Sequence, residues 1–136
     1  MWFIKDNRGT VFLEFVMSFI VLLILWAGMC NCALLFKERL AVASALREAG
    51  REAAVRKDFY AGIDKGYQVL QAAGIPKDRS EVQVYQAAQN LVAAEVTCRS
   101  PVVLPLMNGM MGGNPLAREI VLHDVKVFRY EETPGG

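Results

Sequence analysis

The stretch that decides the fold runs from Phe15 to Phe36 and reads FVMSFIVLLILWAGMCNCALLF. Its 22 residues carry no charge, and only Ser18, Gly28 and Asn31 interrupt their apolar character. A helix rises about 1.5 Å per residue, so this run extends about 33 Å and is long enough to cross a hydrocarbon core of about 30 Å. A soluble helix needs apolar residues on one face only. The run therefore predicts a transmembrane helix.

A cleaved secretory signal is the competing interpretation of this stretch. The apolar part of such a signal has about 7–15 residues, which is shorter than the run here, and no small-x-small cleavage site is suitably placed. The residues from Ala27 to Cys30 come near a lipoprotein cleavage box, but Met29 occupies the position where a small residue is expected. We therefore prefer the membrane anchor.

Charge does not decide the orientation of the span. Lys5 and Arg8 precede it, whereas four cations follow it, namely Lys37, Arg39, Arg47 and Arg51. Counted close to the ends of the span, positive charge does not favour a cytoplasmic N-terminus.

One carboxylate, Glu14, lies at the beginning of the apolar region. A carboxylate at the bilayer centre costs about 2.5–3.5 kcal/mol on insertion scales, and one near the edge costs less. Either Glu14 reaches the headgroups, or it requires a cationic partner from another chain. Cleavage after Gly9 would make Thr10 a new N-terminus four positions before Glu14. An ammonium and a carboxylate attract strongly in low dielectric, so this pair would favour side-by-side packing of processed helices.

These residues resemble a type IV prepilin signal. A short charged leader, residues 1–9, ends in Gly9; an apolar helix begins at Thr10; and Glu14 is its fifth residue. The resemblance implies that a membrane aspartyl peptidase cuts between Gly9 and Thr10, and that Glu14 contacts the N-terminal amine of a neighbour during filament assembly. The family usually methylates a Phe or a similar first residue, so Thr10 leaves methylation open.

The sequence after the span is similar to that of TadE-like proteins, which are minor pilins or pseudopilins of the tight-adherence (Flp, type IVb) pilus system. Residues 40–46 read LAVASAL, with Arg47, Ala49, Gly50 and Arg51 following, and residues 125–131 read VKVFRYE, a strand that closes in an aromatic-acid pair. The similarity covers residues 1–57 well and the remainder loosely. A major Flp pilin would be much shorter than this chain.

The resemblance implies a single-pass protein of the cytoplasmic (inner) membrane, with its C-terminal domain outside the cytoplasm or incorporated into an extracellular pilus. The implied partners are the prepilin peptidase, other pilin or pseudopilin subunits, an inner-membrane assembly platform and the lipid bilayer. An alternative is an unprocessed membrane-anchored binding or sensory module. We expect no enzymatic activity in either case.

Composition excludes other classes of protein. The 136 residues carry a formal net charge of +1, so no excess of cations is present to displace phosphate counterions, and we expect no nucleic-acid partner. A hydrophobic content of 54% and a charged content of 21% exclude a disordered chain.

Helical signals continue beyond the span, and we expect one helix over residues 10–57, with the membrane span at about 15–36. A stripe of mostly small residues recurs at steps of three or four: Phe36, Leu40, Ala43, Leu46, Gly50 and Ala53. The stripe can pack on the chain's own globular part, on neighbouring subunits, or on both. Gly50 indicates either a kink or a close contact. Glu52 and Arg56 are spaced for an i,i+4 pair.

Residues 58–136 predict a small extracytoplasmic α+β domain. A short amphipathic helix should begin near Phe59 and end near Gly74, because Pro76 blocks its continuation. Alternation predicts strands over 81–85, 90–98 and 120–130, with a bulge near His123 and Asp124 where the apolar positions change parity. In the second strand, one face carries Val92, Ala94, Val96 and Cys98. Residues 102–104 form an edge strand or extended stretch at best, and residues 108–115 a loop. The predicted fold class is α+β, in which the long transmembrane helix packs on a three- or four-stranded antiparallel sheet.

The sequence offers no catalytic or metal-binding set. His123 is the one histidine, and Asp124 should point to the opposite face of its strand. Cys30 and Cys32 project from nearly opposite sides of the helix, and Cys98 has no partner within its own domain. We expect three free thiols, no metal and no cofactor.

Overall fold

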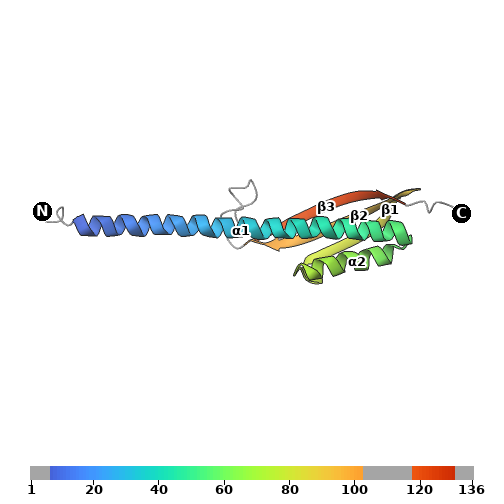
Figure 1. The fold of residues 1–136 in the computed structure, drawn as a ribbon, viewed down its shortest axis with the longest axis horizontal. Helices are drawn as coiled ribbons and strands as arrows, with labels where there is room; N and C mark the ends of the chain where they lie inside the picture. The colour runs from blue at the N-terminus through green and yellow to red at the C-terminus, as the bar shows by residue number, and fades with distance from the viewer. Residues whose placement is uncertain (1–6, 103–117, 131–136) are drawn as a thin grey trace.

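The computed structural model describes residues 7–102 and 118–130 of the chain. A long helix and a short one are followed by a 3-10 turn and three strands: α1 (Asn7–Arg56), α2 (Phe59–Ala72), η1 (Lys77–Arg79), β1 (Ser80–Ala88), β2 (Leu91–Pro101) and β3 (Glu119–Arg129). Figure 1 shows α1 as a rod whose N-terminal half stands alone and whose C-terminal half lies against the sheet and α2. The predicted α+β class is confirmed.

Helix α1 has 50 residues and is about 75 Å long. It begins three residues before Thr10 and ends one residue before Lys57. An 18-residue window within it has a mean hydropathy of 2.4, and only 11% of that window is buried in the protein. The helix is therefore long enough and apolar enough to cross a membrane. The same features are found in a signal-like segment near an N-terminus.

Helix α2 follows α1 after a sharp turn. Lys57 adopts a φ of 54°, which reverses the chain, and Asp58 then caps α2, because its carboxylate accepts a hydrogen bond of 2.9 Å from the backbone N–H of Tyr60. Helix α2 ends at Ala72, and Gly74 follows with a φ of 84°. The predicted short helix and its end near Gly74 are confirmed, since a positive φ suits glycine at this position.

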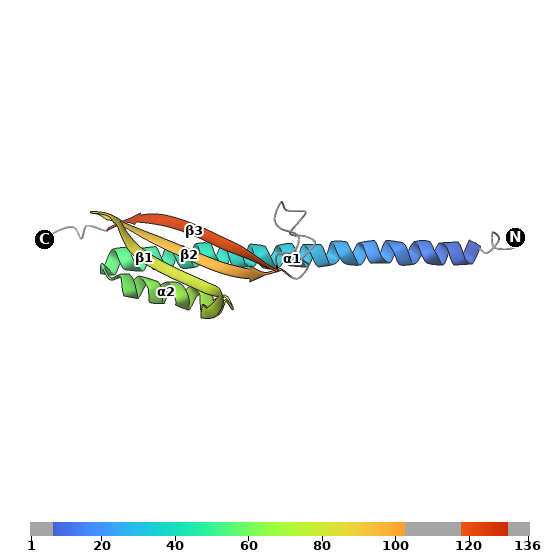
Figure 2. The same ribbon diagram turned by 180° about the vertical axis from the view of Figure 1, so that it is seen from behind.

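The three strands form one antiparallel sheet in the order β1-β2-β3. Figure 2 shows this sheet crossing in front of the C-terminal half of α1, with α2 beside β1. The face turned to the helices includes Val92, Ala94, Val96 and Cys98 of β2, all with no exposed surface. These are the four residues that the alternation placed on one face.

The predicted bulge near His123 and Asp124 is wrong. Strand β3 pairs with β2 without interruption from Glu119, opposite Pro101, to Arg129, opposite Leu91. The apolar positions change parity because valines occupy the outer face of the sheet, where Val125 is 40% and Val127 is 56% exposed. The irregularity in the sheet lies instead in β1, between Gln86 and Ala88.

The chain after β2 also differs from the prediction. Pro101 ends β2 and does not open a separate strand; Val102 lies outside the sheet, and its N–H donates to the Arg118 carbonyl over 2.9 Å. The rest of the predicted 102–104 stretch and the predicted loop at 108–115 lie outside the described residues.

The core forms where α1, α2 and the inner face of the sheet meet. On α1 the buried positions come in adjacent pairs at steps of four: Ala41 and Val42, Ala45 and Leu46, Ala49 and Gly50, Ala53 and Ala54. The part of the predicted stripe from Leu46 to Ala53 is buried, so packing on the chain's own globular part is confirmed for these residues. Phe36 and Leu40, which the stripe included, are 65% and 55% exposed. The predicted pair of Glu52 and Arg56 is present.

Candidate functional site

The three predicted site residues lie in the first turns of α1. Gly9, Thr10 and Glu14 are all exposed, and nothing lies within 4 Å of a Cβ built on Gly9. Thr10 and Glu14 are four residues apart on an unbroken helix, so their side chains lie on the same face. Among the described residues, Glu14 has no hydrogen-bond or ion-pair partner.

The surroundings of Glu14 are apolar and uncovered. Val11, Phe12 and Phe15 are each more than 60% exposed, and together with Arg8 they line a shallow hollow on the helix. The rings of Phe15 and Phe19 stack with their centroids 6.3 Å apart. So much exposed apolar surface is unfavourable in water. This half of α1 therefore needs lipid or other apolar helices around it.

The C-terminal half of α1, α2, η1 and the sheet pack together and are called the head from here on. A second group of polar side chains lies inside the head, at the end of the sheet nearest the exposed half of α1. Arg79 Nη1 lies 3.8 Å from Glu38 Oε1, and Glu38 Oε2 is buried with no hydrogen-bond partner within the described residues. Burial raises the pKa of the nearby Cys98 thiol; the charge of Glu38 raises it further, and the charge of Arg79 lowers it. The thiol is therefore held neutral.

Sequence reasoning missed this group because its members come from α1, η1 and β2. Their separation along the chain leaves no local pattern, and only the fold brings them together. The sequence around Glu38 offered one weak signal: a carboxylate two residues beyond an apolar run and next to a buried stripe needs a partner.

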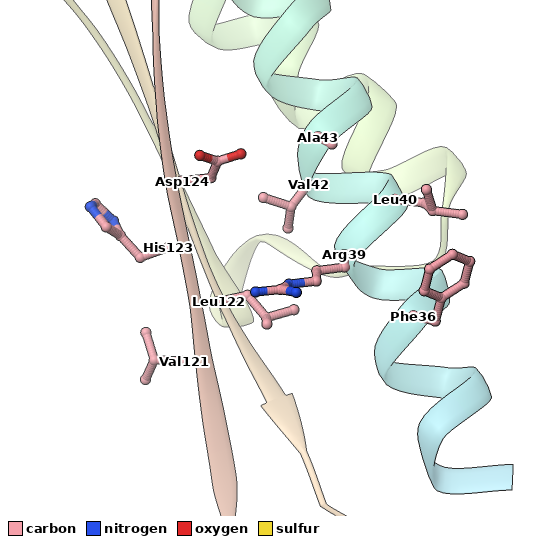
Figure 3. Close-up of a pocket in the computed structure, with 9 residues that line it drawn as sticks. All are labelled: Phe36, Arg39, Leu40, Val42, Ala43, Val121, Leu122, His123 and Asp124. Atoms are coloured by element: carbon pink, nitrogen blue, oxygen red, sulfur yellow. The ribbon is translucent and has the colours of Figure 1, made fainter. Parts of the chain in front are cut away.

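His123 and Asp124 lie on opposite sides of β3, as predicted (Figure 3). The imidazole Nδ1 of His123 is 3.2 Å from the hydroxyl of Thr97 and 3.5 Å from Glu95 Oε1, on the outer face of the sheet. Asp124 Oδ1 accepts the N–H of Val125 over 3.0 Å. The two side chains therefore do not form a catalytic dyad.

The cysteines are all free, with Cys30 and Cys32 exposed and Cys98 buried. Within residues 7–102 and 118–130, no three His, Cys, Asp or Glu side chains lie close enough together to hold a metal ion.

A cavity of about 510 Å³ lies between α1 and β3 (Figure 3). Phe36, Arg39, Leu40 and Val42 line it from the helix, and Leu122 and Asp124 line it from the strand. Sequence reasoning did not anticipate it, because its walls come from α1 and β3, which are far apart in the sequence.

The chain thus has a pilin-like architecture, in which a long apolar N-terminal helix is covered along its C-terminal half by a small antiparallel sheet. Comparison of the chain with protein-family models, with curated proteins and with solved structures found no match.

Proposed function

We propose that this protein is a TadE-like minor pilin or pseudopilin that takes part in assembly of a type IVb (Tad/Flp) pilus for surface adherence. The observation that carries the proposal is the contrast along α1. One face of its C-terminal half is buried against the sheet and α2, whereas its N-terminal half presents uncovered apolar side chains and one carboxylate, Glu14, without a partner among the described residues. A subunit that packs through this half of its helix accounts for both features.

In this proposal a prepilin peptidase cuts the bond between Gly9 and Thr10. The first N–H groups of a helix have no acceptor within the helix, so the first turn of α1 opens at small cost to enter a peptidase. The new amine of Thr10 then lies one helical turn before Glu14, at the polar edge of the apolar span. Burying the amine or the carboxylate alone in apolar surroundings costs much free energy, whereas burying the two as an ion pair costs much less.

Assembly follows from where these charges meet. The carboxylate of Glu14 on one helix attracts the Thr10 amine of a neighbouring helix. This attraction fixes the axial position of the two apolar helices relative to one another. The proposal assigns the head to contacts with other subunits and the inner-membrane platform, and it assigns no catalytic step to this chain.

The first experiment is co-expression with a prepilin peptidase, followed by N-terminal sequencing of the membrane-bound product. We expect a mature chain that begins at Thr10, and we expect Gly9→Val to block cleavage. A product that retains Met1 through Gly9 in the presence of active peptidase would contradict the proposal.

The second experiment tests Glu14 after cleavage. Glu14→Leu should be cleaved normally but should abolish incorporation into sheared pili. Ser18→Leu is the matched control, because it replaces a polar residue by leucine one turn further along the same face. Equal loss in both variants would show that Glu14 has no special role.

The alternative is an unprocessed membrane-anchored binding or sensory module, in which the Gly9–Thr10 bond stays intact within α1. This alternative predicts that Gly9→Val is harmless and that Glu14→Leu is neutral or mildly stabilising.

A further inference from the structure

The cavity between α1 and β3 lies at a particular level of the molecule. Phe36 is the last residue of the apolar run, and Arg39 is three residues further, or about 4.5 Å along the helix axis. A bilayer has a core of about 30 Å and a total thickness of about 40–45 Å, so each headgroup layer is about 5–8 Å deep. With the apolar run in the hydrocarbon core, Arg39 and the mouth of the cavity lie in the headgroup layer.

The cavity carries one positive and one negative side chain from opposite walls. In Figure 3, Arg39 extends from α1 toward Leu122, Asp124 projects from β3 on the side of the helix, and Val42 lies between them. Arg39 forms no ion pair within the described residues, and Asp124 accepts one hydrogen bond there, from the N–H of Val125 to its Oδ1. Within this part of the chain, neither charge is therefore neutralised by an oppositely charged side chain.

No other charged side chain enters the cavity from β3. His123 contributes to the wall of the cavity, but its ring is turned to the outer face of the sheet, toward Thr97 and Glu95. The remaining lining residues named above are apolar. Among residues 7–102 and 118–130, the cavity therefore combines one guanidinium, one carboxylate and apolar walls at the level of the lipid headgroups.

We propose that this cavity binds the headgroup of a zwitterionic membrane phospholipid that carries a primary ammonium. Arg39 donates hydrogen bonds to the phosphate, which a guanidinium matches in geometry and charge. Asp124 accepts from the ammonium through its free oxygen. Phe36 and Leu40, at the edge of the cavity on α1, contact the first methylenes of the acyl chains.

The pairing of charges favours a zwitterionic lipid over an anionic one. An anionic headgroup satisfies Arg39 but brings negative charge near Asp124, and this repulsion selects against it. The zwitterionic headgroup places an opposite charge against each side chain. The inference requires α1 to span a membrane, but it requires neither cleavage at Gly9 nor incorporation into a pilus.

Native mass spectrometry of the full chain in detergent micelles tests the proposal. The protein is titrated with phosphatidylethanolamine and with phosphatidylglycerol of identical acyl chains. We expect phosphatidylethanolamine to bind about twofold to fivefold more tightly, because this is the change in affinity that the free energy of one partly exposed ion pair produces. Equal affinity for the two lipids, or dimers that form in place of lipid-bound monomers, would overturn the proposal.

Four variants assign the effect to the two side chains. Arg39→Gln should weaken binding of both lipids, and Asp124→Asn should remove the preference for phosphatidylethanolamine. The matched controls are Arg51→Gln on the same helix and Glu119→Gln on the same strand, which should bind as the wild type does. If Asp124→Asn lowers the thermal midpoint, its lipid affinity no longer reports on the side chain alone. The proposal is then tested by comparing the lipid affinities of Arg39→Gln and Arg51→Gln. Unchanged binding in Arg39→Gln would overturn the proposal.

A third ligand distinguishes membrane lipid from a free phosphate compound. Soluble glycerophosphoethanolamine carries the same headgroup without acyl chains. We expect it to bind far more weakly than the lipid, because it lacks the contacts with Phe36 and Leu40. Equal affinity would contradict a membrane source for the ligand.

Discussion

The ring of Phe128, near the end of β3, lies directly on the backbone of Gly50, six residues before the end of α1. A Cβ built on Gly50 would lie 2.1 Å from both Cδ2 and Cε2 of that ring. This contact joins the last strand to the long helix, and it explains why a residue that weakens helices by about 1 kcal/mol stands here without kinking α1.

Gly50→Ala should therefore destabilise the head although alanine is the better helix former. The gain in helix propensity is about 1 kcal/mol, whereas overpacking costs about 1–3 kcal/mol, so the net loss is up to about 2 kcal/mol. Thermal unfolding of the full chain in detergent, followed by circular dichroism, measures this change. Ser44→Ala, on an exposed face of α1, is the control and should leave the midpoint unchanged or raised. A midpoint that rises equally in both variants would show that the ring moves aside freely.

The contact of α2 with α1 depends on a second glycine. A Cβ on Gly62 would lie 2.7 Å from the carbonyl oxygen of Ala49 and 2.7 Å from Cβ of Ala53. Backbone atoms of a helix cannot move aside as a side chain does. Gly62→Ala should thus lower stability more than Gly50→Ala.

Gly66→Ala is the matched comparison for Gly62→Ala. Its Cβ would mainly meet a methyl group of Val82 at 2.9 Å, and a side chain of this kind can shift. We expect the order of stability to be wild type, then Gly66→Ala, then Gly62→Ala, as measured by thermal midpoints. The reverse order of the two variants would contradict the assignment of the backbone contact.

The fold was predictable where a single stretch of sequence determines the element. The uncharged run after Glu14 is too long and too uniformly apolar for a soluble helix, and the alternation from Val92 to Cys98 matches a strand with one buried face. Gly74 and Pro76 predicted where α2 ends. In each case the physical cause acts within a few residues, so the sequence alone carries it.

The rest depended on contacts between distant segments. The parity change in β3 was interpreted as a bulge, because the sequence does not reveal that Val125 and Val127 can stay exposed on the outer face of the sheet. Likewise, nothing local relates Glu38 to Arg79, or Arg39 to Asp124. The predicted roles of Gly9, Thr10 and Glu14 remain predictions, since they concern a peptidase and neighbouring chains.

The junction of α1 and α2 offers a test of the cap. The carboxylate of Asp58 accepts the N–H of Tyr60 over 2.9 Å. Asp58→Ala should cost about 1 kcal/mol, and Asp58→Asn, whose amide oxygen can replace the carboxylate, should cost little. Denaturant titration of the full chain in detergent measures both. Equal losses in the two variants would show that the charge, not the hydrogen bond, matters.

Cys98 should make the stability of the head depend on alkaline pH. Burial and the nearby charge of Glu38 raise the pKa of its thiol above the ordinary value of 9.0. Between 9.0 and the higher pKa of the folded state, the unfolded chain has released a proton that the folded chain retains. Raising the pH in this interval therefore favours unfolding, by at most about 1.4 kcal/mol per pH unit. Below 9.0 the contribution of the neutral thiol is fully present.

The measurement is the denaturation midpoint of the wild type and of Cys98→Ala at neutral and alkaline pH. Lysines and tyrosines titrate in both proteins, so the difference between their pH profiles isolates the thiol. We expect the wild type to lose more stability than Cys98→Ala as the pH rises. Glu38→Gln should reduce that loss, because it removes a charge that opposes the thiolate, and Arg79→Met should increase it. Parallel profiles for the wild type and Cys98→Ala would show that the thiol ionises alike in the folded and unfolded chains.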